Sequence, residues 1–247
     1  MNLQGNEAYE NHLKNIAICR NKFIDIVVPF YVPHNNIVGS FDCLGSGFII
    51  QRSGHPFIIT AAHVIRDVAK RQDSSRMLTI INGEELDITG SLFVVNDKLD
   101  LAVTALENNN RSNIKSIIVD GDDFGIQETV VAYGFPATSN KLGKFNLKRH
   151  LLMLAIDFSH QDDAGIFYNY NKKKIITESG ENKGTGQDLH GMSGGPILSI
   201  HQDVGHNITM SLAGIITGQD PQNKLLIATR VHKLAEFIDR ALSAENI

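Results

Sequence analysis

Short runs of β-prone residues alternate with turn residues along most of this 247-residue chain. Turn signals such as Ser53-Gly54 and Asn82-Gly83 separate the runs. This pattern is typical of an all-β sandwich or barrel. The strands expected in the two halves of the chain cover residues 24–30, 45–51, 57–60, 77–82, 91–95 and 99–106, and then 129–133, 147–158, 174–177, 197–200, 208–217 and 225–228.

Helical spacing of apolar residues occurs in three further segments. Leu13, Ile16 and Ala17 have this spacing, which predicts a short N-terminal helix. Residues 61–71 predict one or two helical turns directly after a strand, and residues 229–244 repeat apolar side chains on one face. Helices are therefore expected on either side of the β-rich region.

A polar stretch divides that β-rich region. Residues 119–128 contain Asp120-Gly121-Asp122-Asp123 and are the best candidate for a linker. The predicted organisation is an N-terminal helical extension, a first β-rich half, the linker, a second β-rich half and a C-terminal helix, at residues 1–22, 23–118, 119–128, 129–228 and 229–247.

Composition argues against several classes of partner. The formal net charge of -4 does not favour nucleic acid, which usually requires concentrated positive charge. The first residues lack the features of a secretory signal, and no apolar run is long enough to cross a bilayer. We therefore expect a cytoplasmic location without membrane association, and we expect Cys19 and Cys43 to be free thiols.

Three candidate catalytic residues occur in separate motifs. Ser193 lies within Gly191-Met192-Ser193-Gly194-Gly195-Pro196, His63 follows an apolar run, and Asp100 precedes another. A serine hydroxyl attacks only when a base removes its proton, and histidine titrates near neutral pH. A carboxylate on the second ring nitrogen fixes the histidine tautomer and stabilises its charged form. The set indicates acyl-transfer chemistry.

Asp97 competes with Asp100 for the role of the acid. Asp97 lies in the polar turn Asn96-Asp97-Lys98, whereas Asp100 leads directly into Leu101-Ala102-Val103. Asp100 is therefore the predicted acid.

These motifs resemble those of the chymotrypsin-like serine proteases, in particular the bacterial trypsin-like peptidases and the protease domain of the HtrA group. The resemblance covers about residues 23–230, and its motifs occur in the order of that family. They are Gly45-Ser46-Gly47-Phe48-Ile49-Ile50, Phe57-Ile58-Ile59-Thr60-Ala61-Ala62-His63-Val64, Asp100-Leu101-Ala102-Val103, Tyr133-Gly134-Phe135-Pro136 and Gly191-Met192-Ser193-Gly194-Gly195-Pro196-Ile197-Leu198.

The resemblance implies a fold and an activity. The fold would be two six-stranded antiparallel β-barrels, at residues 23–118 and 129–228, with a short N-terminal helix and a C-terminal helix. The first barrel would supply His63 and Asp100, and the second would supply Ser193. The activity would be that of a serine endopeptidase acting on protein or peptide substrates through an acyl-enzyme intermediate. Neither a cofactor nor a metal is expected.

The resemblance also implies roles for residues around Ser193. The backbone N–H groups of Gly191 and Ser193 would form the oxyanion hole. Main-chain pairing along Ile216, Thr217 and Gly218 would hold an extended peptide, and Thr217 could donate its hydroxyl to Asp100.

The specificity pocket is less readable than the triad. Gln187 stands where an acid would select basic side chains, so a preference for arginine or lysine does not carry over. Asp188 and His190 are the other candidate substrate-binding residues, although each could equally be an ordinary loop residue.

Met192 is a departure from secreted trypsins, which place an aspartate before the serine to pair with a new N-terminus after cleavage. A methionine cannot make that ion pair. We therefore expect the full-length chain to be competent without trimming.

Two alternatives stay open at this level. A binding module could keep the cleft and have lost catalytic geometry. An esterase on an α/β-hydrolase fold could use Asp203 and His232, but the strand-like run after Pro196 argues against it, because that fold requires a helix directly after the serine.

Overall fold

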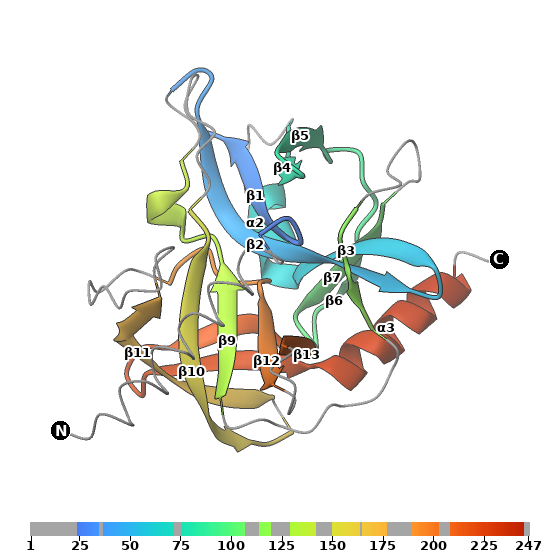
Figure 1. Ribbon diagram of the computed structural model, residues 1–247. Helices are drawn as coiled ribbons and strands as arrows, with labels where there is room; N and C mark the ends of the chain where they lie inside the picture. The colour runs from blue at the N-terminus through green and yellow to red at the C-terminus, as the bar shows by residue number, and fades with distance from the viewer. Residues whose placement is uncertain are drawn as a thin grey trace.

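The computed structural model describes nine segments of the chain (Figure 1). They are residues 24–34, 37–71, 76–106, 114–119, 129–141, 150–163, 165–176, 189–202 and 208–244. The expected N-terminal helix at 1–22 lies outside these residues, as does nearly all of the expected linker at 119–128.

Within these segments, eight strands of the first half form one sheet, in the order β5-β4-β1-β2-β3-β7-β6 with β8 beside β2. Two-residue turns join β2 to β3 and β4 to β5, and Ser53-Gly54 and Asn82-Gly83 all have the positive φ that a type I′ turn requires. The strands are β1 (Val27–Pro33), β2 (Phe41–Arg52), β3 (His55–Ala61), β4 (Leu78–Ile81), β5 (Glu84–Asp87), β6 (Val94–Asn96), β7 (Leu101–Ala105) and β8 (Ile117–Ile118).

Six strands of the described second half close into a barrel, in the order β10-β11-β14-β13-β12-β9. All of its strand pairs are antiparallel. The strands are β9 (Thr129–Gly134), β10 (Leu152–Gln161), β11 (Ile166–Ile176), β12 (Pro196–Gln202), β13 (Ile208–Asp220) and β14 (Leu225–Arg230).

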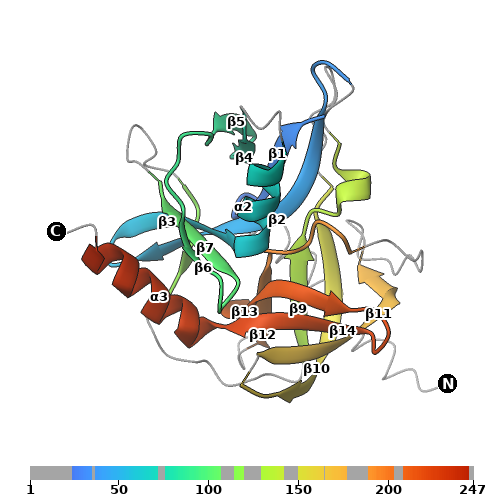
Figure 2. The same cartoon turned by 180° about the vertical axis from the view of Figure 1, so that it is seen from behind.

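Short helical elements connect and cover the two sheets. Helix α2 (Ala62–Lys70) follows β3 directly, and the 3-10 helix η1 (Ala137–Ser139) follows β9. Helix α3 (Val231–Ala244) follows β14 and extends past the first sheet, as Figure 2 shows from behind. No helix among the described residues is long and apolar enough to cross a membrane.

One apolar cluster joins the two halves. Val27 and Phe48 of the first sheet belong to the same buried cluster as Val131 of the barrel and Ile238 of α3. The sheet, the barrel and the last helix therefore share a core, with a second cluster inside the barrel and a third within the first sheet.

The architecture agrees with the predicted class and confirms the six-stranded barrel of the second half. The described strands of the first half form an eight-stranded sheet without closing it, and β8 pairs with β2 in parallel, so a second closed barrel stays a prediction. Helices α2 and α3 lie where helical spacing predicted them. The sequence interpretation missed β5 and β8 and all but the end of β11.

Candidate active site

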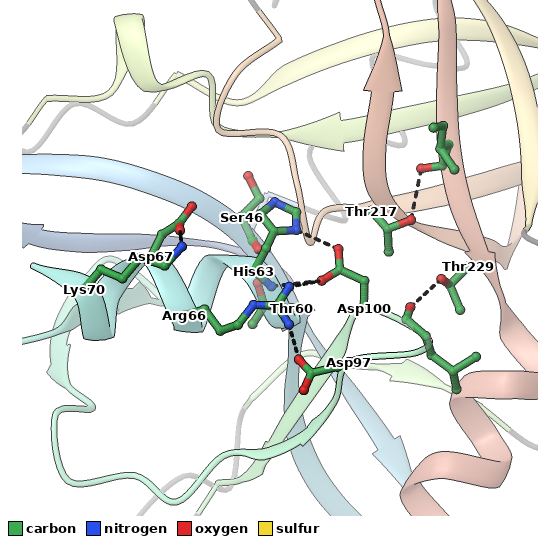
Figure 3. Close-up of polar contacts among 12 residues, drawn as sticks. Ser46, Thr60, His63, Arg66, Asp67, Lys70, Asp97, Asp100, Thr217 and Thr229 are labelled. Atoms are coloured by element: carbon green, nitrogen blue, oxygen red, sulfur yellow. Dashed lines mark hydrogen bonds and ion pairs between the residues drawn. The ribbon is translucent and has the colours of Figure 1, made fainter.

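His63 and Asp100 form a close pair at the end of the first sheet (Figure 3). His63 lies in the first turn of α2, because β3 ends at Ala61 and the helix begins at the next residue. Its Nδ1 is 2.6 Å from Asp100 Oδ2, and its backbone N–H donates to Asp100 Oδ1 at 2.9 Å. A carboxylate only accepts hydrogen bonds, so Nδ1 carries the proton and Nε2 is left as the basic nitrogen.

The backbone of Asp100 is part of the same arrangement. Asp100 ends the turn before β7 with a φ of 51°, in the left-handed region that aspartate and asparagine tolerate best among non-glycine residues. Its carbonyl accepts the N–H of Ala62 at 3.0 Å, next to His63. The pair is therefore held by backbone as well as side-chain bonds.

Arg66 completes the surroundings of the acid. It lies one helical turn after His63 and donates from Nη2 to Asp100 Oδ1 at 3.3 Å, while Nη1 pairs with Asp97. The structure thus pairs His63 with Asp100 and places Asp97, whose side chain is 74% exposed, on Arg66. This arrangement agrees with the choice of Asp100 over Asp97.

Ser193 lies in a loop that packs directly on the first sheet. Its carbonyl accepts the N–H of Ser46 in β2 at 2.8 Å. The following residue, Gly194, has a φ of 85°, and a Cβ there would collide with Ser46 and Thr60. Because Thr60 is three residues before His63, this contact brings the serine loop to the strand that delivers the histidine. Within the described residues, no hydrogen bond joins the Ser193 hydroxyl to His63.

The carbonyls of residues 190–193, in the loop that carries Ser193, all have partners. His190 O accepts from Ala137 N–H at 2.8 Å, and Met192 O accepts from Gly195 N–H at 2.9 Å. The C=O and N–H of a trans peptide point in opposite directions, so the N–H groups of Gly191 and Ser193 point away from these partners. Neither N–H donates to any protein group in the described part of the chain.

The side chain of Met192 enters the barrel core. It is 1% exposed and belongs to the buried apolar cluster inside the barrel. The residue before Ser193 is therefore anchored by apolar packing, which needs no charged partner.

The predicted substrate-binding residues divide into two groups. Gln187 and Asp188 lie outside the described residues, whereas His190 is exposed next to Gly191. Ile216, Thr217 and Gly218 lie on β13 behind the serine loop, where Ile216 O accepts from Gly194 N–H at 2.7 Å and Ile216 N–H donates to Gly195 O at 2.9 Å.

Thr217 does not make the bond to Asp100 that the resemblance implied. Its hydroxyl donates instead to Ile227 O at 3.4 Å. The pairing of β13 with β14 shifts register between Ile216 and Gly218, which turns the side chain of Thr217 toward β14.

Sequence reasoning assigned no role to several residues that hold the site together. The hydroxyl of Ser46 donates to Gly191 O and accepts from Phe135 N–H, both at 2.7 Å. Thr60 donates to Ser46 O at 2.7 Å, and Thr229 donates to Leu99 O at 2.8 Å. The placement of Ser46 between Gly45 and Gly47 was the one visible signal, since glycines often mark a close approach of backbones.

Cys43 lies in β2 near this site but has the properties of a core residue. It is a free thiol, 2% exposed, and burial raises its pKa to about 12. A thiol is nucleophilic only as the thiolate, so Cys43 is unsuited to act as a nucleophile.

Comparisons with known proteins agree with this geometry. The family model for the trypsin-like peptidase domain matches residues 45–204, which is more than half of the chain. No curated protein matches.

Among solved structures, the serine endoprotease from Yersinia pestis is similar over 90% of this chain, with a TM-score of 0.51 and 18% sequence identity. This chain covers 65% of that protein's chain. At this level of identity the structural match bears on the fold, and the family match extends from Gly45 past Ser193. The chain therefore belongs to the trypsin-like peptidase domain family.

Proposed function

We propose that this chain is a serine endopeptidase that uses His63, Asp100 and Ser193 as its catalytic triad. The observation that carries the proposal is the doubly bonded His63–Asp100 pair, in which Nε2 has no partner among the described residues. The loop of Ser193 lies beside it, bonded to β2 through Ser46 N–H and in contact with Thr60 of β3. Family membership supports the same reaction class. The proposal includes closure of the first sheet into the second barrel of a chymotrypsin-like fold, with peptide substrate lying between the halves.

In each half-reaction, His63 takes up one proton and then gives it back. His63 Nε2 takes the proton of Ser193 Oγ while that oxygen bonds the scissile carbonyl carbon, whose π electrons move to the carbonyl oxygen. The C–N bond then breaks, and His63 gives its proton to the leaving amine. Water attacks the acyl-enzyme in the same way, which releases the acid and restores the Ser193 hydroxyl.

The two free N–H groups of Gly191 and Ser193 supply the stabilisation that the negative oxygen needs. Both are backbone donors with no acceptor among the residues that the structure describes, so the oxyanion would not have to displace one of the described bonds. Loss of one such donor typically costs roughly 3 to 4 kcal/mol in the transition state. Substrate backbone would pair along Ile216, Thr217 and Gly218 by strand addition, and His190 would contact the substrate beside the oxyanion hole.

Labelling of the intact chain with a fluorophosphonate tests this function. We expect one modified residue, Ser193, identified by mass spectrometry of peptides from the labelled protein. Ser193→Ala should abolish the label and His63→Ala should slow it strongly, because the hydroxyl then lacks its base. His55→Ala removes an exposed histidine from the β2–β3 hairpin and should leave the rate unchanged.

A peptide-library cleavage profile of wild type and Ser193→Ala completes the test. Labelling of another residue, or labelling indifferent to His63→Ala, would contradict the assigned triad. Peptide binding without labelling or cleavage would identify a catalytically silent binding module instead.

A further inference from the structure

The hydroxyl of Ser46 is enclosed between the two halves of the molecule. Ser46 is 0% exposed and lies in β2, whereas both partners of its hydroxyl belong to the barrel half. Phe135 N–H donates to Ser46 Oγ, and the same oxygen donates its proton to Gly191 O. The three groups form a continuous hydrogen-bonded chain with one donor for each acceptor.

Ser46 makes two of the four hydrogen bonds to the carbonyls of residues 190–193. The carbonyls of residues 190–193 bond to Ala137 N–H, the Ser46 hydroxyl, Gly195 N–H and Ser46 N–H, in that order. The Ser46 hydroxyl is the one side-chain donor of the four. It fixes the Gly191–Met192 peptide, which lies between the two peptides that carry the free N–H groups.

The bond from the Ser46 hydroxyl matters for this loop because none of the loop's own side chains is charged and could orient it through an ion pair. Residues 191–195 are Gly-Met-Ser-Gly-Gly, and Met192 is anchored by apolar contacts, which constrain position more than peptide orientation. Gly191 has a φ of 94° and no side chain, so hydrogen bonds decide how its two flanking peptides are oriented. Ala137 N–H bonds to His190 O, and Met192 N–H donates to Leu189 O at 3.0 Å. The buried bond from the Ser46 hydroxyl holds the carbonyl of the Gly191–Met192 peptide, and the bond from Phe135 N–H orients that hydroxyl.

We propose that Ser46 is a positioning residue that holds the Gly191–Met192 peptide so that the N–H groups of Gly191 and Ser193 face the reacting carbonyl oxygen. The role rests on the proposed peptidase function and adds to it the device that sets the oxyanion hole before substrate binds. Ser46 belongs to the half that carries His63. The oxyanion hole is therefore oriented when the two halves dock against each other.

Ser46→Ala removes the hydroxyl but keeps the backbone bond from residue 46 to Ser193 O. We expect kcat for a peptide substrate to fall about 10²-fold with KM little changed, because the bonds lost act on the transition state. Ser46→Cys, whose thiol is a weaker donor, should give a smaller loss. Ser199→Ala is the matched control, since Ser199 is 1% exposed in β12, outside the serine loop, and its removal should leave kcat unchanged.

Amide hydrogen exchange gives a readout that does not depend on activity. In Ser46→Ala, the amides of Ala137 and Gly195 should exchange at least about tenfold faster, because their acceptors lie on the freed loop. The same amides in Ser199→Ala should exchange as in wild type. If wild type proves inactive, the peptidase proposal fails while the exchange experiment still tests the positioning role.

Two results would overturn the inference. One is a Ser46→Ala protein with a lowered melting temperature but wild-type kcat, which would make the hydroxyl purely structural. The other is unchanged exchange at Ala137 and Gly195, which would show that the loop keeps its orientation without the hydroxyl.

Discussion

Asp100 combines an unusual backbone with the central side-chain contacts of the candidate site. Its left-handed φ of 51° turns the chain so that the carbonyl meets Ala62 while the carboxylate meets His63. Only a few residue types tolerate that backbone, and of these aspartate alone supplies a charged acceptor. One residue therefore meets a conformational and an electrostatic requirement together.

Asp100→Asn separates these two requirements. Asparagine tolerates the left-handed region equally well, so the melting temperature should fall only modestly. Turnover should fall by about 10⁴-fold, because the amide can donate to Nδ1 and favour the wrong tautomer of His63. Steady-state kinetics and a thermal melt of the same preparation measure both effects. A variant that keeps turnover within about tenfold of wild type would contradict the role given to Asp100.

The pairing of His63 with Asp100 could be predicted from the sequence, whereas the residues that hold the loop of Ser193 in place could not. His63 and Asp100 stand in motifs whose flanking apolar runs predicted their strands, and the structure brings them together. Ser46 was visible only as a serine between two glycines, because its partners Phe135 and Gly191 are far away in the chain. The acceptor of Thr217 depended on a strand irregularity that no local pattern announces.

At the scale of elements, turns position the site more than strands do. Gly194 turns the serine loop toward β12 with a positive φ, and its missing side chain lets Ser46 and Thr60 approach. Gly54 has a similar φ of 80° in the β2–β3 hairpin but has open space where a Cβ would lie. The two glycines therefore differ in packing and share a backbone conformation.

Gly194→Ala and Gly54→Ala distinguish conformational cost from close contact. Gly54→Ala should lower the free energy of unfolding by about 1 to 2 kcal/mol, the cost of a left-handed alanine, with labelling of Ser193 unchanged. Gly194→Ala should cost more, because backbone atoms must also move apart, and should slow labelling severely. Urea unfolding curves and fluorophosphonate kinetics measure these outcomes. Equal stability losses would show that the packing around Gly194 relaxes freely.

Elements with strong local signals were predicted correctly, while polar or very short ones were missed. The hairpin turns at 53–54 and 82–83 and helix α2 follow from turn residues and apolar spacing. Strand β5 reads Glu-Glu-Leu-Asp, and β8 has two residues, so neither resembles an apolar strand. Such strands form because neighbouring strands offer hydrogen-bond partners to their backbones. Those partners are set by the tertiary structure and cannot be read from the local sequence.

At the scale of the whole molecule, an ion pair fastens the last helix to the first sheet. Arg52 at the end of β2 binds both carboxylate oxygens of Asp239 in α3, at 2.7 Å each, and donates to Val119 O at 2.7 Å. The hydrogen bonds from Arg52 lower the pKa of Asp239. The pair therefore favours the folded state when Asp239 is ionised.

Asp239→Asn should destabilise the protein in a pH-dependent way. A lowered folded pKa contributes stability that is present above the unfolded value of about 3.9 and is lost as pH falls through the folded pKa. At pH 7 we expect a loss of about 0.5 to 1 kcal/mol, since the Asp239 side chain is half exposed. The difference from wild type should shrink as the pH is lowered below about 4.

Melting temperatures measured from pH 3 to pH 7 test this dependence. Asp67→Asn, which removes an exposed pair with Lys70 within α2, is the matched control and should have a smaller effect. A difference between Asp239→Asn and wild type that stays constant across this range would contradict the assigned role of the pair.

The apolar cluster shared by both halves has a consequence for when the candidate site can assemble during synthesis. Val27 and Phe48 leave the ribosome long before their core partners Val131 and Ile238, and Ser193 is made after His63 and Asp100. The shared core is therefore incomplete until Ile238 has been synthesised, which is after all three residues of the proposed triad. The order of residues along the chain thus ties assembly of the proposed triad to completion of that core.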